Sequence, residues 1–150
     1  MVDIDLVIES IRLHNEKELP KNIDKKLFLY SAVLRDADKI DWLYAMVNII
    51  PKLPIEEQKV FYSNKSNSNE VSDKLIEEIL NKRAVVRTEL STICELQLSG
   101  LGFITSDFNY KPSIDIIKKE NLIEKIYSMM DKSEKVNIIH NFVLDYVASV

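Results

Sequence analysis

The chain has 150 residues, of which 46% are hydrophobic and 29% charged, as expected of one soluble globular domain with its own core. Its net charge of −4 argues against broad docking on nucleic acid or on an anionic membrane, because such proteins present a basic surface. No long apolar run predicts a membrane span, and the acidic N-terminus lacks the basic start of a signal peptide, so we expect a cytoplasmic protein. The single cysteine, Cys94, excludes an internal disulfide and, among apolar neighbours, predicts an inert buried thiol.

Helix-favouring residues dominate the chain, and two glycines and four prolines leave little turn chemistry. Hydrophobic residues recur at helical spacing over residues 4–14, which predicts the first helix. A charged loop containing Pro20 follows. The second and longer helix is predicted over residues 24–50, where Pro51 ends it.

A serine- and asparagine-rich stretch, residues 62–69, predicts a loop between two helical blocks, 1–61 and 70–150, of a single domain. Ser113 and Ser133 are the predicted N-caps of two helices in the second block. The helices of that block are predicted over residues 71–82, 88–106, 114–118, 121–130 and 133–148. No strand is predicted, so the expected fold is all-α, a compact helical bundle of six or seven helices.

Charged residues interrupt the second helix at positions 34–42, LRDADKIDW. On a helical wheel, Asp36 falls in the middle of the apolar face, and Asp38 lies on another side that apolar residues also flank. We therefore expect both aspartates to be at least partly buried, and a buried carboxylate needs a partner. One interpretation is structural, with an aspartate that caps another helix or pairs with Arg12 or Arg35. The other interpretation is a metal ligand.

Three segments of the chain then resemble one known family in the same order. Residues 36–41, DADKID, are similar to the last metal-ligand motif of the HD-domain superfamily of metal-dependent phosphohydrolases. Residues 10–20, with SIRLHN followed by LP, are similar to the segment before this motif in one bacterial branch. Residues 101–113, with LGFI, DFNY and PS, resemble the helical C-terminal tail of that branch. The resemblance implies an HD-domain-like fold over most of the chain.

The resemblance also implies roles for individual residues. Asp38 corresponds to the superfamily's final metal-binding aspartate, and His14 to a histidine that serves a second metal or the substrate phosphate. Lys39 follows the ligand and would meet a phosphate, whereas Asp36 would support neighbouring groups. Apart from the resemblance, Arg35 belongs to a local excess of basic residues around this site that would attract a phosphate-bearing substrate. The implied cofactor is a divalent metal ion (Mg, Mn, Fe, Ni or Zn), and the implied substrate is a small phosphorylated molecule such as a nucleotide.

The sequence departs from the superfamily at its defining residues. Its two histidines, His14 and His140, are each followed by asparagine, so the His-Asp dyad is absent and the resemblance covers the C-terminal half of an HD domain. We expect His140 at the edge of the core. Two hypotheses follow. The chain is part of a metal-dependent phosphohydrolase, or it is a non-catalytic helical remnant or interaction module.

The second hypothesis predicts apolar surface on the first two helices, open to a second copy or to a separate upstream half-domain. The first hypothesis requires His14 and Asp38 to converge. Asp38 lies roughly 21 Å along its helix, measured from the start. Residues 15–22 span about 26 Å when extended, so convergence is possible if this loop runs back beside the second helix.

Overall fold

The computed structural model describes residues 3–16, 19–106 and 108–150. In these ranges the chain forms eight α-helices, two short 3-10 helices and no strand, apart from an isolated bridge between Ser66 and Thr92. The predicted all-α fold is confirmed, with one helix more than expected. The elements are α1 (Ile4–Leu13), α2 (Lys25–Asn48), η1 (Ile50–Lys52), α3 (Ile55–Phe61), α4 (Asp73–Leu80), η2 (Arg87–Glu89), α5 (Ile93–Ser106), α6 (Lys111–Lys119), α7 (Leu122–Ser128) and α8 (Glu134–Ser149). Residues 17–18 and 107, within the segments that carry the resemblance, lie outside the described residues.

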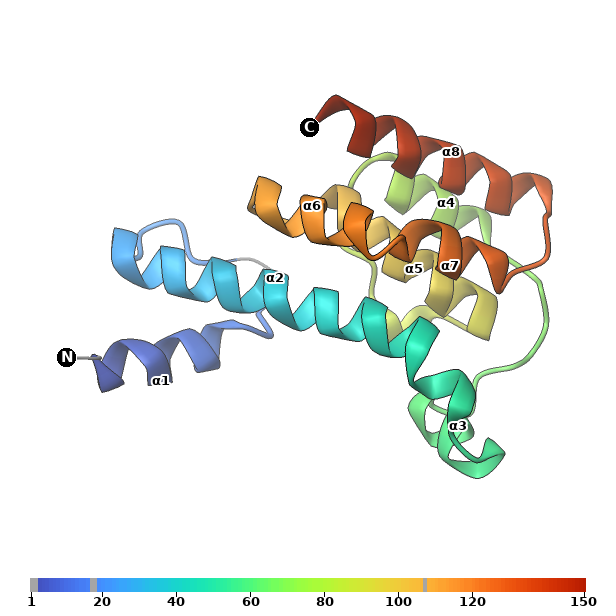
Figure 1. Ribbon diagram of the computed structural model, residues 1–150, viewed down its shortest axis with the longest axis horizontal. Coiled ribbons are helices and arrows are strands. Elements are labelled where there is room, and N and C mark those ends of the chain that lie inside the picture. The colour runs from blue at the N-terminus through green and yellow to red at the C-terminus, as the bar shows by residue number, and fades with distance from the viewer. Residues whose placement is uncertain (1–2, 17–18, 107) are drawn as a thin grey trace.

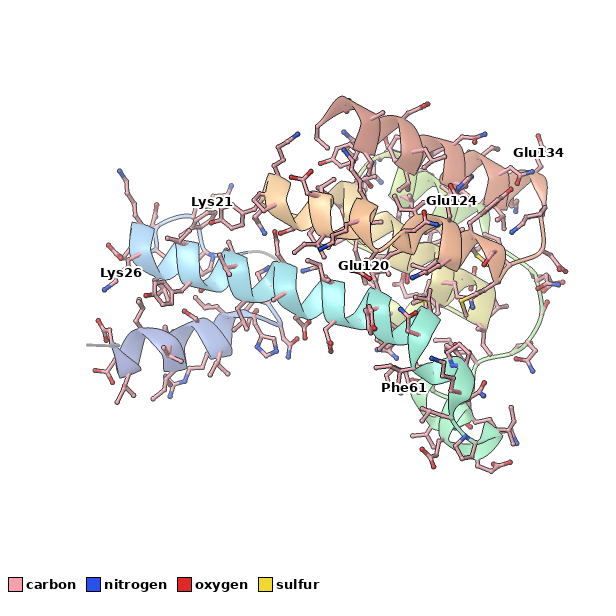
Figure 2. The ribbon with its side chains drawn as sticks, viewed as in Figure 1. Lys21, Lys26, Phe61, Glu120, Glu124 and Glu134 are labelled. Atoms are coloured by element: carbon pink, nitrogen blue, oxygen red, sulfur yellow. The ribbon has the colours of Figure 1, made fainter. Side chains whose placement is uncertain are left out.

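Helix α2 is the longest of the described helices, and it connects α1 with the bundle formed by the later helices (Figure 1). Its second half packs against α6 and α7, and behind these α5 packs against α8 and α4. Its first half extends beyond this bundle and contacts α1. Figure 2 shows Lys21 and Lys26 toward this projecting end and Phe61 below the second half of α2.

Helices α1 and α2 lie side by side and run in the same direction (Figure 1). In a parallel pair both helices begin at the same end, so α2 starts on the same side of the molecule as α1 (Figure 1). As a result, the C-terminal end of α1 lies beside the middle of α2. The fold therefore brings the segment that carries His14 to the part of α2 that carries Asp38.

The core is formed by aliphatic side chains from α2, α4, α5, α6, α7 and α8. Helix α5 lies at its centre and is buried along nearly all of its length. Gly102 permits the close approach of α5 to α4, because a Cβ at this position would lie 2.9 Å from Cγ1 of Ile79. Any larger residue at position 102 would force the two helices apart.

Helix α5 begins at Ile93, five residues later than predicted. Residues 87–89 form a 3-10 turn instead, and a capping box starts the α-helix. In this box the Thr92 hydroxyl accepts the Glu95 N–H at 3.0 Å, and the Glu95 carboxylate accepts the Thr92 N–H at 3.4 Å. Glu95 also accepts the backbone N–H of Ser72 at 2.9 Å, so one buried carboxylate joins the N-terminal ends of α4 and α5.

Two predicted N-caps have different outcomes. The Ser133 hydroxyl accepts the Val136 N–H and caps α8, as predicted. Ser113 was expected to cap its helix, but α6 begins two residues earlier, at Lys111. The prediction is wrong because the Ser113 hydroxyl is a donor to Asp36 of α2, 2.6 Å away, and not an acceptor for its own helix.

Both N-terminal helices expose apolar side chains. On α1, which turns Ser10 toward α2, the outward residues Ile4, Ile8 and Ile11 are 70%, 44% and 52% exposed. On α2, Val33 is half exposed although the helical wheel places it on the apolar face. None of the described helices combines the length and hydrophobicity needed to cross a lipid bilayer.

Candidate functional site

A cavity of about 590 Å³ lies between the C-terminal end of α1, the middle of α2, the segment that leads into η2, and α5. We call it the site cavity. Four of the five residues that the sequence singled out border it, namely His14, Arg35, Asp38 and Lys39, and Asp36 does not. The other lining residues are Asn15, Glu16, Trp42, Ala84, Val85, Val86, Arg87, Leu96, Ser99 and Phe103.

Arg35 holds the end of α1 against α2. Its guanidinium Nη1 donates to the carbonyls of Leu13 and His14, at 3.5 and 3.4 Å, and to that of Glu16. These are carbonyls that a helix leaves unsatisfied at its C-terminus, where a positive charge is also favoured by the helix dipole. The side chain is 93% buried, so Arg35 positions the segment that carries His14 while it borders the cavity.

His14 is half-buried at the point where α1 ends. Its Nδ1 lies 2.5 Å from the carbonyl oxygen of Ile11. Because a carbonyl can only accept, this contact places the proton of the neutral ring on Nδ1 and leaves the lone pair on Nε2. A histidine in this tautomer can accept a hydrogen bond or bind a cation through Nε2.

Asp38 is exposed at the edge of the cavity, and the prediction that it is at least partly buried is wrong. The side of α2 on which it lies borders this open space and is not covered by another helix. No hydrogen bond or ion pair joins Asp38 to the rest of the described chain. Its carboxylate therefore remains available to a ligand.

Asp36 has a structural role and is almost completely buried. Its carboxylate accepts the backbone N–H of Asn109 at 3.0 Å, that of Tyr110 at 3.1 Å, and the Ser113 hydroxyl at 2.6 Å. The Asn109 side-chain amide donates to it as well, at 2.9 Å. The structural interpretation, in which a buried aspartate caps another helix, describes this contact: Asp36 of α2 fixes the start of α6.

The sequence analysis missed the far wall of the cavity. The Arg87 guanidinium lies over the Trp42 ring, 4.8 Å from its centroid, and donates to the carbonyl of Phe61 at 3.1 Å. Trp42 also stacks on Phe61, with centroids 5.3 Å apart and ring planes 7° apart. Arg87 precedes α5 in a stretch without motif or periodicity, so only the tertiary fold places it here.

The described residues at the cavity do not make up a complete set of protein ligands for a metal ion. Among residues 3–16, 19–106 and 108–150, no cluster of three or more His, Cys, Asp or Glu side chains is placed to hold one. His14 and Asp38 supply two donors, whereas a tightly held divalent ion takes about four or more ligands. A complete metal site would need further ligands.

Two residues that were set aside in the sequence lie away from the cavity. His140 is buried in α8 at the edge of the core, where it stacks on Tyr127 at 3.7 Å and contacts Glu124 Oε1 at 2.8 Å. Cys94 is buried in α5, and this burial raises the pKa of its thiol, as expected of an unreactive cysteine.

The comparisons with known proteins do not extend this description: no protein-family model, curated protein or solved structure matches the chain. Any functional assignment therefore depends on the residues that border the site cavity and on the sequence resemblance that selected three of them, His14, Asp38 and Lys39.

Proposed function

We propose that the chain binds a small phosphorylated molecule, such as a nucleotide, in the site cavity, as the C-terminal half of an HD-superfamily phosphohydrolase. One observation carries the proposal. His14 from the end of α1 and Arg35, Asp38 and Lys39 from α2 border a single cavity, although 20 residues separate the two segments. The resemblance assigns metal or phosphate roles to His14, Asp38 and Lys39, and Arg35 belongs to the local excess of basic residues.

The chemistry of the cavity wall suits such a ligand. Three cationic side chains, Arg35, Lys39 and Arg87, border it together with two carboxylates, Glu16 and Asp38. Cationic N–H donors are the groups that bind phosphate oxygens most strongly. A volume of about 590 Å³ lies within the usual range of small-molecule sites. Apolar side chains at the cavity would contact the non-phosphate part of the ligand, namely Trp42, Val85, Val86, Leu96 and Phe103.

The proposal separates binding from hydrolysis. In a complete site of this superfamily a divalent metal activates water for attack on phosphorus. Because His14 and Asp38 are two donors and not a full ligand set, we propose hydrolysis only for the assembled site. The remaining ligands would come from a separate upstream half-domain, and ligand binding is proposed for this chain alone.

Titration calorimetry with AMP and with inorganic phosphate tests the binding step. We expect the wild type to bind AMP and Lys39→Ala to bind it about tenfold more weakly, as expected when one charge-assisted contact is lost. Lys59→Ala is the matched control, because Lys59 is exposed on α3 and pairs with Glu56 there. Absence of AMP binding by the wild type, or equal binding by Lys39→Ala, would overturn the proposal.

Metal analysis of the purified chain tests whether His14 and Asp38 are only part of a metal site. We expect well below one metal ion per chain and no phosphatase activity, with activity appearing when a polypeptide that carries a His-Asp dyad is added. One metal per chain that is lost in Asp38→Ala would show instead that this chain completes the site by itself.

A second candidate is a non-catalytic interaction module. The outward isoleucines of α1 favour it, because Ile4, Ile8 and Ile11 present an apolar stripe that the fold leaves uncovered. AMP binding that depends on Lys39 would favour the first candidate. If the chain is folded but binds neither AMP nor inorganic phosphate, the second candidate is favoured.

A further inference from the structure

Arg87, at the far wall of the site cavity, is held in place from three sides. Its guanidinium lies over the ring of Trp42 in α2, 4.8 Å from the centroid. Its Nη2 donates to the carbonyl of Phe61, at the end of α3, at 3.1 Å. Its own carbonyl accepts from Nζ of Lys65 at 3.3 Å, so the backbone of η2 is held as well. An arginine that is positioned in advance loses less side-chain freedom when a ligand binds.

The other donors of Arg87 are available to a ligand. A guanidinium carries five N–H donors in one rigid plane. In the part of the chain that the structure describes, the hydrogen bond to Phe61 uses one of them, and no carboxylate pairs with the group. Arg35, in contrast, directs its Nη1 at three carbonyls where α1 ends. The remaining fork of Arg87 is suited to the oxygens of a phosphate group.

Arg87 and Lys39 border the cavity at neighbouring turns of α2. Lys39 and Trp42 are three residues apart, which separates them by about 4.5 Å along the helix axis and about 60° around it. Because Arg87 lies over Trp42, its guanidinium is placed one turn beyond Lys39 on the same side of the helix. Two phosphate groups that share a bridging oxygen are also neighbours. Successive cations along this wall can therefore each bind one of them.

The positive charge of the cavity wall depends on Arg87. Three cations, Arg35, Lys39 and Arg87, border the cavity with two carboxylates, Glu16 and Asp38. Without Arg87 the two signs are equal in number. A ligand with a second phosphate carries more negative charge than a monophosphate, and Arg87 supplies the positive charge that balances it.

We propose that Arg87 binds a second phosphate group, so that the site cavity prefers a nucleoside diphosphate to a monophosphate. This inference rests on the proposed function, in which Lys39 binds the first phosphate. Lys39 then serves both ligands, and Arg87 determines the preference between them. The contacts with Trp42 and Phe61 hold the guanidinium in position before the ligand enters.

Titration calorimetry with ADP and AMP, in buffer free of divalent metal, tests the role of Arg87. We expect the wild type to bind ADP about tenfold more tightly than AMP, through one more charge-assisted contact. Arg87→Met should lose this preference and keep an affinity for AMP within about threefold of the wild type. Lys39→Ala should weaken the binding of both nucleotides.

Arg83→Met is the matched control. It removes the same charge from the segment before η2, where Arg83 is exposed, pairs with Glu77 and does not border the cavity. This variant should keep the preference for ADP. If Arg87→Met does not fold, Arg87→Lys replaces it, since lysine keeps the charge but lacks the planar fork, and it should also lose most of the preference.

The outcomes separate this inference from the proposed function. A wild type that binds AMP and ADP equally tightly would overturn the role of Arg87 and leave the binding of AMP in place. The same holds if Arg87→Met keeps the preference, or loses affinity for both nucleotides to the same extent. A wild type that binds neither nucleotide would overturn both proposals.

Discussion

The Asp36 carboxylate accepts a hydrogen bond from the Ser113 hydroxyl at 2.6 Å, across 77 positions of the sequence. Both side chains are buried, and the same carboxylate accepts the N–H groups of Asn109 and Tyr110. The first turn of an α-helix leaves its N–H groups without partners inside the helix. Helix α2 supplies the acceptor for the start of α6, so the two helices depend on each other.

Replacement of Asp36 by alanine should therefore destabilise the whole domain. Four donors would lose their acceptor, among them the buried Ser113 hydroxyl, and we expect a loss of about 2–4 kcal/mol in the free energy of unfolding. Urea denaturation followed by circular dichroism measures this loss. Asp115→Ala is the matched control, since Asp115 is exposed on α6 and should change stability by about 0.5 kcal/mol or less. A comparable effect of the two variants would contradict the role assigned to Asp36.

The two glycines of α5 should respond differently to alanine. At Gly102 a Cβ would lie 2.9 Å from Ile79 Cγ1, and we expect Gly102→Ala to cost about 1–3 kcal/mol through overpacking. At Gly100 a Cβ would lie 3.2 Å from the flexible end of Met46 and from Leu43, so a small shift suffices. The higher helix propensity of alanine, about 1 kcal/mol, should offset that cost. Thermal unfolding of both variants tests the difference, and equal melting temperatures would contradict it.

Glu95 should give the domain a distinct dependence on acid. Burial opposes ionisation of this carboxyl, but the backbone N–H groups of Ser91, Ser72 and Thr92 outweigh it and hold the pKa of Glu95 below its usual value. A lowered pKa in the folded state stabilises the protein above the ordinary value of 4.5, and this contribution disappears as pH falls through the folded pKa.

The measurement is the free energy of unfolding of wild type and Glu95→Gln between pH 7 and pH 3. Glutamine keeps the shape of the side chain but does not titrate. We expect the variant to be less stable at pH 7 and the difference to shrink as the pH falls below about 4.5. A difference that stays constant over this range would show that ionisation of Glu95 has no part in stability.

Arg35→Met should loosen the segment that carries His14. Methionine keeps the apolar stem but removes the donors to the carbonyls of Leu13, His14 and Glu16. We expect hydrogen exchange at residues 13–16 to become about tenfold faster, while the second half of α2 stays protected. Arg12→Met is the control, because Arg12 is exposed and pairs with Glu9 in the same helix. Unchanged exchange in Arg35→Met would mean that other contacts hold this segment.

Helical periodicity predicted most of the architecture because each helix buries an apolar stripe. The starts of helices were less predictable, since they depend on caps that come from elsewhere in the fold. Helix α5 starts where Thr92 and Glu95 form a capping box, and α6 starts where Asp36 supplies an acceptor from another helix. Periodicity shows which residues share a face but not whether anything covers that face. Val33 therefore lies on the apolar side of α2 and is half exposed.

The candidate site was predictable to the extent that short motifs identify residues. The DADK motif and the His14 segment identified three residues at one cavity, His14, Asp38 and Lys39, and the long loop allowed them to meet. The exposure of Asp38 was not predictable from its helical position, because a cavity and not a helix lies beside it. Arg87 could not have been found, since its place over Trp42 results from the packing of η2 against α2.

Consecutive side chains of α2 point in directions about 100° apart, so a single turn serves different parts of the molecule. Asp36 reaches into the interior, Ala37 is exposed to solvent, and Asp38 and Lys39 border the cavity. A codon-by-codon mutational scan through this turn should thus give phenotypes that change in kind from one position to the next. We expect loss of stability at position 36, little effect at the exposed position 37, and altered ligand affinity at positions 38 and 39.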